Sequence, residues 1–260
     1  MIALVIIAAL LLVVFLFHAI MSIKEQKDFP APGKLVSFDD EQLHIFSMGQ
    51  KSDTLPTVII LHDCGECAPA VCHFSLMNEL STQYRVVTVE RCGHGWSSDT
   101  FAQRTAADIV YEYRTVLQHS GEGGMPYILL PFGNALSFAS YWQKNFPDEV
   151  EKIISVKTHN KAPANSILPS VIGILRECGF LRLYNLFVPV SDEQTGGNTA
   201  VYKALANSRT MSIPAREEIK AFVLSEPGKT DDGEVQFDEN DTTALTNELF
   251  SYTKQLDLCE

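Results

Sequence analysis

The chain has no cluster of lysine and arginine residues. Its 20 basic side chains are outnumbered by 32 acidic ones, which gives a net charge of −12. Nucleic-acid binding needs basic side chains gathered against phosphates, so we predict no nucleic-acid partner. The same shortage argues against a polybasic membrane-surface protein. Glycine and proline number only 15 and 12 in 260 residues, too few for a collagen-like or disordered chain. What remains is an acidic globular protein.

Charged side chains are also missing from the first 23 residues, which are almost entirely apolar. As a helix, this run covers about 34 Å, enough for a hydrocarbon core of about 30 Å. No basic residue precedes the run, and it is longer than the core of a signal peptide. We therefore predict an uncleaved single-pass anchor in the cell membrane, in preference to a cleaved signal peptide or a buried soluble helix. Lys24 and Lys27 alternate with acidic residues, which leaves the side of the membrane open.

A second metal-binding knuckle is absent. Cys64 and Cys67 have the C-x2-C spacing of a zinc ligand pair, but a structural zinc site normally pairs two such knuckles. A domain of more than 200 residues does not need disulfides either. We predict small, buried or half-buried thiols, with a local disulfide or a zinc site as the alternatives. No cofactor and no metal are expected.

Strand and helix patterns alternate along the first part of the chain. A linker precedes two short strands within 34–46, which turn at Asp39-Asp40. Apolar, β-branched runs then predict buried strands at 57–61, 84–89, 127–130 and 150–156. Helical patterns separate them at 74–80, 105–119 and 134–145. This alternation predicts an α/β fold with a mainly parallel sheet and flanking helices.

The pattern changes beyond residue 156. Helical patterns follow at 166–186, 198–208, 214–224 and 242–256, and the polar stretches 189–197 and 226–240 are expected to be loops. We find no convincing strand in this part. The domain organisation predicted is an anchor at 1–23, a linker at 24–33 and one domain at 34–260. A helical cap is expected at about 164–225.

Three segments follow predicted strands, at the edge of the sheet where ligands bind in open α/β folds. They read LHDCGE at 61–66, VERCGHGWSS at 89–98, and YILLPFGNALSFASYWQKNFPDEVEKII at 127–154. With these phrases in this order, the chain resembles the alpha/beta hydrolase superfamily. It is most similar to the membrane-anchored members of Gram-positive bacteria. The resemblance implies an alpha/beta-hydrolase-like sheet, an oxyanion loop after the first central strand, and a nucleophile elbow ahead of a helix.

The resemblance implies a serine at the elbow, but the chain has none there. The phrase around Pro147 matches the helix after the elbow, and counting back places the nucleophile position on Gly133. Gly133 and its neighbours Asn134 and Ala135 suit the sharp turn. Ser137 lies one helical turn further on, away from the apex. We expect an elbow without its hydroxyl group, where Gly133→Ser restores the shape but no activity.

The resemblance also implies a catalytic histidine near the C-terminus. The last histidine of the chain is His159, and Lys157 stands where some members carry the catalytic acid. A Ser-His-Asp unit works through all three groups together, so losing two of them removes most of its rate. The catalytic motifs are thus degenerate, and the C-terminal part is expected to be shortened.

The resemblance further implies an oxyanion pocket built from backbone N–H groups. One donor would come from Asn134, after the elbow, and the other from Asp63 or Cys64 in the loop after the first central strand. His62 and His94 occupy motif positions with structural or oxyanion-loop roles. The negative charge of Asp63 would disfavour an oxyanion.

Three functions are compatible with these residues. The favoured one is a non-catalytic or impaired homologue, anchored in the lipid bilayer, that binds a small-molecule ligand in the elbow cleft. The alternative is an active hydrolase of the esterase or peptidase class with an unrecognised nucleophile such as Cys64, because a thiol needs less activation than a hydroxyl. The third is a decayed gene product without a fixed function.

Overall fold

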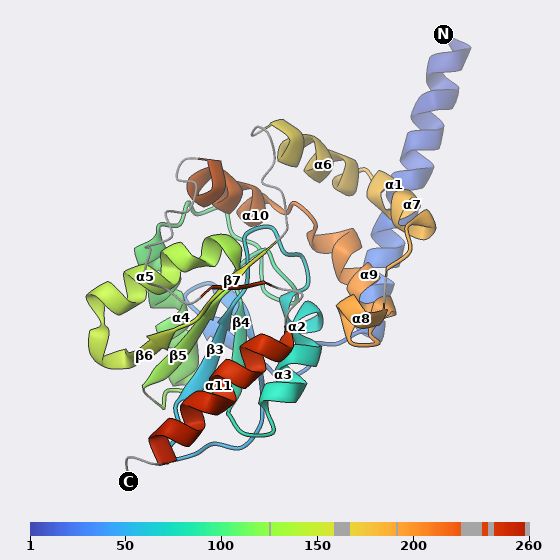
Figure 1. Ribbon diagram of the computed structural model, residues 1–260. Coiled ribbons are helices and arrows are strands. Elements are labelled where there is room, and N and C mark those ends of the chain that lie inside the picture. The colour runs from blue at the N-terminus through green and yellow to red at the C-terminus, as the bar shows by residue number, and fades with distance from the viewer. Residues whose placement is uncertain (125, 159–166, 191, 225–235, 239–241, 258–260) are drawn as a thin grey trace.

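A central six-stranded sheet carries the fold (Figure 1). The computed structural model describes residues 1–124, 126–158, 167–190, 192–224, 236–238 and 242–257. The strands lie in the order β1-β2-β4-β3-β5-β6. Their bounds are β1 (Lys34–Phe38), β2 (Glu41–Met48), β3 (Thr57–Leu61), β4 (Val86–Glu90), β5 (Tyr127–Pro131) and β6 (Val150–Ile153). From β4 to β6 all neighbours are parallel, whereas β1 and β2 are antiparallel. The predicted mainly parallel sheet is confirmed.

The central strands are buried on both faces, because helices cover each side. Every residue of β3, β4 and β5 is buried. Successive side chains of a strand point to opposite faces. Ile59 accordingly packs into the cluster with α4 (Ala106–Ser120) and α5 (Leu136–Asn145), and Ile60 into the cluster with α3 (Phe74–Leu80) and α11 (Thr242–Asp257). This two-sided burial explains why the strands read as continuous apolar runs.

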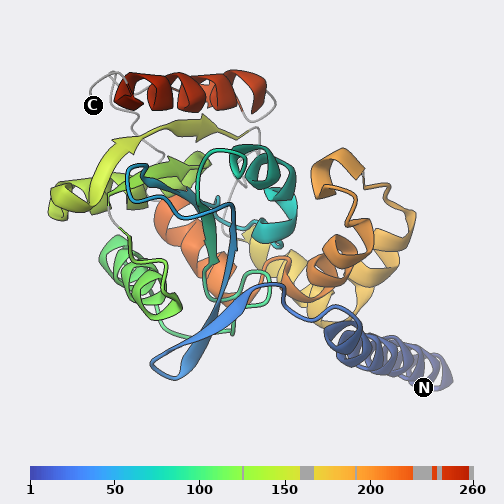
Figure 2. The ribbon, with the colours of Figure 1, turned by 90° about the horizontal axis from the view of Figure 1, so that it is seen from below.

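The remaining regular elements connect these layers or form the cap. The short connecting elements are α2 (Pro69–Cys72), η1 (Gly133–Ala135) and η2 (Pro147–Glu149). The cap contains α6 (Ile167–Glu177), α7 (Phe180–Phe187), α8 (Asp192–Thr195), α9 (Thr199–Arg209), α10 (Ile213–Glu218) and η3 (Ile219–Leu224). In Figure 2, the cap helices α7 to α9 lie between the sheet and the N-terminal helix, and α11 lies on the opposite side of the molecule.

Four predictions for the C-terminal half are wrong. The single strand predicted at 150–156 is two strands in different sheets, because β6 ends at Ile153 and β7 (Ser155–Lys157) belongs to a separate two-stranded sheet. The stretch predicted as a loop at 226–240 contains β8 (Gln236–Asp238), which pairs in parallel with β7. The middle residue of β8, Phe237, packs against the apolar cluster that contains α3 and α11, but three residues are too few for an alternating apolar pattern to reveal a strand. The loop predicted at 189–197 contains the single turn of α8. The helix predicted at 166–186 is two helices, which Gly179 separates with φ of +84°.

The N-terminal helix α1 (Ile2–Asp28) projects away from the domain (Figure 1). It is long and apolar enough to cross a membrane, and its apolar stretch is not buried inside the protein. The helix continues five residues beyond the predicted anchor, so the first half of the expected linker is helical.

Candidate functional site

Gly133 lies at a sharp turn between a strand and a helix. β5 ends at Pro131, Gly133 opens η1, and α5 follows at once. The backbone of Gly133 has φ of +52°, in the left-handed region that glycine adopts without steric strain. The turn thus lies at the carboxyl end of a central parallel strand, the edge at which open α/β sheets place their ligand sites.

The carboxylate of Asp63 fills this turn. Its Oδ1 accepts the backbone N–H of Asn134 at 2.9 Å, the side-chain amide of Asn134 at 3.1 Å and the backbone N–H of Cys64 at 2.7 Å. Its Oδ2 accepts the hydroxyl of Thr158 at 2.7 Å. The residue is only 3% exposed. Four donors therefore satisfy a buried charge, and hydrogen bonds to an ionised group are the strong ones.

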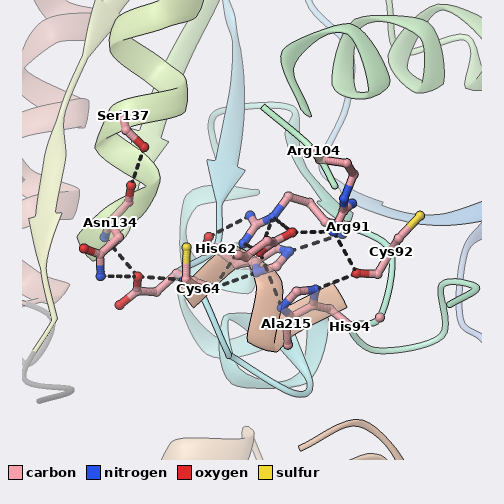
Figure 3. A network of polar contacts seen from close by, with 12 residues as sticks. His62, Cys64, Arg91, Cys92, His94, Arg104, Asn134, Ser137 and Ala215 are labelled. Atoms are coloured by element: carbon pink, nitrogen blue, oxygen red, sulfur yellow. Dashed lines mark hydrogen bonds and ion pairs between the residues drawn. The ribbon is translucent and has the colours of Figure 1, made fainter. Parts of the chain in front are cut away.

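The backbone N–H groups of Asn134 and Cys64 have the geometry of an oxyanion pocket. They come from the residue after the turn and from the loop after β3, and they converge on a single oxygen (Figure 3). That oxygen belongs to the protein itself. The sequence indicated the two N–H donors. It did not indicate that the Asp63 side chain accepts their hydrogen bonds, or that Thr158 contributes a further one.

No side chain fits on residue 133 while the Asp63 carboxylate occupies the turn. A Cβ atom added to Gly133 would lie 2.3 Å from Oδ2 of Asp63 and 2.5 Å from Oγ1 of Thr158. That Gly133→Ser restores the shape of the elbow but no activity stays a prediction. A serine at this position also needs Asp63 to move, because the carboxylate takes the space that its Cβ would need.

His62 and His94 are buried beside each other, with ring centroids 4.8 Å apart. Nδ1 of His62 donates to the carbonyl of Asp63 at 3.0 Å, and its Nε2 accepts the N–H of Arg91 at 3.2 Å. Nδ1 of His94 donates to the carbonyl of Cys92 at 3.1 Å. Burial lowers the pKa of His94 to about 4 and that of His62 well below its usual value. Both rings are neutral near pH 7 and hold backbone groups in place.

A buried ion-pair cluster joins the cap to this region. Nη2 of Arg91 lies 2.9 Å from Oε2 of Glu218 on α10, and Arg104 binds the other oxygen of that carboxylate at 2.6 Å. Arg91 also donates to the carbonyl of His62 at 2.9 Å (Figure 3). Burial alone would raise the pKa of Glu218, but Arg91 and the neighbouring cations hold it at about 2. Sequence reasoning missed Glu218, whose helix shows no sign of an inward-facing carboxylate.

Cys64 is half-buried, and its thiol is not activated. Burial and, next, the charge of Glu218 raise the pKa of this thiol well above its usual value. The described cysteines, which are Cys64, Cys67, Cys72, Cys92 and Cys178, are free thiols. Across the described ranges, no group of histidine, cysteine and acidic side chains could hold a metal ion.

The other positions singled out in the sequence lie outside the turn or outside the described residues. Ser137 is exposed on α5, and its hydroxyl donates to the carbonyl of Asn134 at 2.8 Å. Lys157 is exposed at the end of β7, and His159 lies outside the described residues. A cavity of about 310 Å³ opens elsewhere, between the end of α1, β2 and α9, with Phe29, Phe74 and Trp96 in its wall. No residue of the elbow lines this cavity.

Comparison with known proteins supports the architecture. No protein-family model matches the chain. The uncharacterized protein YbdG of Bacillus subtilis is 28% identical over 243 residues, which cover 81% of this chain and 74% of that protein. Two solved structures with similar folds are the enol-lactonase from Burkholderia xenovorans and the haloalkane dehalogenase DatA from Agrobacterium tumefaciens. The enol-lactonase has a TM-score of 0.63 at 11% identity, over 85% of this chain and all of that one. The dehalogenase has a TM-score of 0.54 at 13% identity, over 86% and 97% of the two chains.

Identities this low establish the fold alone. A third similar structure, the alpha/beta hydrolase enzyme MGS-M2 from a Medee basin deep-sea metagenome library, has a TM-score of 0.51 at 12% identity and covers 73% of this chain and 71% of its own. The mainly parallel sheet with helices on both faces agrees with these similarities. The chain therefore has the alpha/beta-hydrolase fold, preceded by an apolar helix long enough to cross a membrane.

Proposed function

We propose that this is a non-catalytic protein of the alpha/beta-hydrolase fold, held in the cell membrane by α1 as a single-pass anchor. Its proposed role is non-covalent binding at the elbow and not acyl transfer. One observation carries the proposal: the buried carboxylate of Asp63 accepts the two backbone N–H groups that an oxyanion would need.

Serine-hydrolase chemistry needs a nucleophile, a general base and oxyanion donors in one place. Gly133 offers no hydroxyl group. The donors on Asn134 and Cys64 already bind a negative charge, which repels a second negative charge placed beside it. Both ring nitrogens of His62 and Nδ1 of His94 bond to backbone groups, and Nε2 of His94, which has no hydrogen-bond partner, lies 3.8 Å from Oε2 of Glu218. The missing hydroxyl and the occupied N–H donors support the proposal that this turn does not carry out acyl transfer.

The alternative with Cys64 as nucleophile is disfavoured. Nucleophilic cysteines have lowered pKa values, because the thiolate is the reactive form. Burial raises the pKa of Cys64 instead. The backbone N–H of this residue is also committed to the carboxylate of Asp63. We therefore assign Cys64 a structural role in the loop.

The elbow favours particular ligand chemistry. A ligand that enters there meets the carboxylate of Asp63 in place of free N–H donors. We propose that the small-molecule ligand carries a positive charge or hydrogen-bond donors. Butylammonium and butyrate, which differ chiefly in the sign of their charge, are suitable probes. We expect butylammonium to raise the melting temperature of the full-length protein more than butyrate does, and we expect Asp63→Asn to remove the difference. Equal effects of the two probes would contradict this assignment.

Activity assays test the loss of catalysis directly. We expect the full-length protein in detergent to remain unlabelled by a fluorophosphonate probe and to hydrolyse p-nitrophenyl butyrate no faster than the detergent buffer does. Iodoacetamide should modify Cys64 only at alkaline pH, with Cys64→Ser as the control. Ester turnover that disappears in Cys64→Ser would instead show that the cysteine alternative is correct.

A further inference from the structure

The cap helices α6 and α7 carry a large apolar surface on their outer side. Ile174 is 58% exposed and Phe187 is 86% exposed. The exposed apolar residues of the pair are Ile167, Leu168, Val171, Ile174 and Leu175 on α6, and Phe180, Leu183, Tyr184, Leu186 and Phe187 on α7. Water-soluble proteins rarely expose contiguous apolar surface of this extent.

The inner side of the same helices carries their buried charges. Arg176 and Arg182 are only 6% and 5% exposed. Arg176 donates to the carbonyl of Ser208 on α9 at 2.6 Å. A surface helix in water places its apolar stripe inward and its charges outward. Apart from the exposed Glu177 at the end of α6, the helices α6 and α7 do the reverse, which indicates that their outer side does not face water.

The helix pair is continuous with α1. A Cβ atom on Gly179, at the junction of α6 and α7, would lie 2.8 Å from Cβ of His18 and 3.1 Å from the carbonyl oxygen of Val14. Further along α1, Nη2 of Arg182 lies 2.9 Å from Oε2 of Glu25. The pair thus contacts α1 inside its apolar run and again at its first acidic residue. In Figure 1, α6 and α7 lie on the side of the domain from which the N-terminal part of α1 projects.

The contact with Val14 sets the depth of this junction. Val14 precedes the end of the uncharged run at Ile23 by nine residues, or about 13 Å along the helix axis. This distance is slightly greater than the depth of about 5–10 Å to which amphipathic helices in a membrane interface bury their apolar face. A bilayer that α1 crosses up to Ile23 therefore includes the level of Gly179.

We propose that α6 and α7 insert their apolar side into the same leaflet that α1 enters, so that lipid acyl chains cover it. The cap is then a second membrane attachment beside the anchor. The inference rests on the membrane anchoring in the proposed function. Because Gly173 of α6 packs against Arg216 of α10, the inserted pair also adjoins the helix that carries Glu218.

Photo-crosslinking in lipid vesicles tests this placement on the full-length chain. The amino acid p-benzoylphenylalanine is introduced singly at Ile174 or Tyr184, and the protein is reconstituted into phosphatidylcholine and phosphatidylglycerol vesicles and irradiated. Tyr111 on α4, which is 59% exposed, is the matched control, and Leu10 on α1 reports the anchor. We expect lipid adducts by mass spectrometry at Leu10, Ile174 and Tyr184 and none at Tyr111.

The four crosslinking positions distinguish a failure of the cap insertion from a failure of the membrane anchoring. Lipid adducts at Leu10 without adducts at Ile174 and Tyr184 overturn the insertion of the cap and leave the anchor in place. The absence of adducts at Leu10 overturns the anchoring itself. Crosslinks from Ile174 or Tyr184 to a second copy of the chain, in place of lipid, also overturn the proposal, because they would show that another protomer covers this surface.

Discussion

The backbone N–H of Asn134 donates to Oδ1 of Asp63 at 2.9 Å, across 71 residues of sequence. This bond joins the loop after β3 to the turn after β5, the two segments that an oxyanion pocket requires. The acceptor is a carboxylate of the protein, so the pocket is occupied from within. The absence of a side chain on Gly133 is what leaves room for that carboxylate.

Gly133→Ala is expected to destabilise the fold more than an ordinary glycine substitution does. A side chain in the left-handed region costs about 1–2 kcal/mol, and overpacking a filled site adds about 1–3 kcal/mol. Gly121 also has a positive φ, but a Cβ there meets no atom within 4 Å, so Gly121→Ala should show the backbone cost alone. Urea unfolding of both variants in detergent measures the difference. Equal losses would mean that Asp63 does not fill the site.

The loss in Gly133→Ala is expected to shrink when Asp63 is removed. The Cβ of residue 133 clashes with the Asp63 carboxylate and with Oγ1 of Thr158. Asp63→Gly removes the first clash and releases the Thr158 hydroxyl from its hydrogen bond, so that this hydroxyl can rotate away. The double variant should therefore lose less free energy of unfolding than the two single variants lose in sum. A double-mutant cycle isolates this coupling. Strict additivity would show that the two positions do not compete for space.

The variant that combines Gly133→Ser with Asp63→Gly is expected to remain inactive toward short p-nitrophenyl esters. It restores a hydroxyl and frees the N–H groups of Asn134 and Cys64, but both ring nitrogens of His62 and Nδ1 of His94 are bonded to backbone groups. General-base catalysis contributes on the order of 10²–10⁴ in rate. Labelling by a fluorophosphonate probe would reveal a hidden base, with His94 or the undescribed His159 as the first residues to substitute.

Glu218→Gln is expected to destabilise the protein by about 3–5 kcal/mol, because it leaves the buried cations Arg91 and Arg104 without their shared carboxylate. The neighbouring Glu217 forms only a partly exposed pair with Lys220, at 2.6 Å. Glu217→Gln is therefore a matched control with a loss near zero. Urea unfolding of the two variants provides the comparison. Similar stabilities would show that the cluster does not hold the cap to the core.

His94 is expected to make the fold sensitive to acid. Its pKa is lowered from 6.5 to about 4 in the folded state, so the unfolded chain binds the proton more readily between these values. The contribution of neutral His94 to the free energy of unfolding is therefore complete above about pH 6.5. It is lost as the pH falls toward 4, by at most on the order of 3 kcal/mol. His94→Gln should flatten the stability profile from pH 7 to pH 4.5. An unchanged slope in this variant would assign the acid sensitivity to other groups.

Several features followed from the sequence alone. The strand at 57–61 was predicted with its observed bounds, because helices cover both faces of β3 and leave a run of apolar residues. The helix after residue 105 begins with a capping box between Thr105 and Asp108, a purely local signal. The small residues at 133–135 indicated a sharp turn, because glycine adopts backbone angles closed to other residues. These features depend on neighbours in the chain.

Contacts between distant segments were decided only by the tertiary structure. Asp63 or Cys64 was expected to lend a backbone N–H, but the side chain of Asp63 turns onto Asn134 and Thr158, 71 and 95 residues away. The pairing of Arg91 with Glu218 spans 127 residues and gives no periodic signal. The short strand β8 pairs with β7 and packs Phe237 against the core, two contacts that only the fold supplies. A side chain's direction depends on which surfaces the fold brings together, because a buried charge must find its donors wherever packing places them.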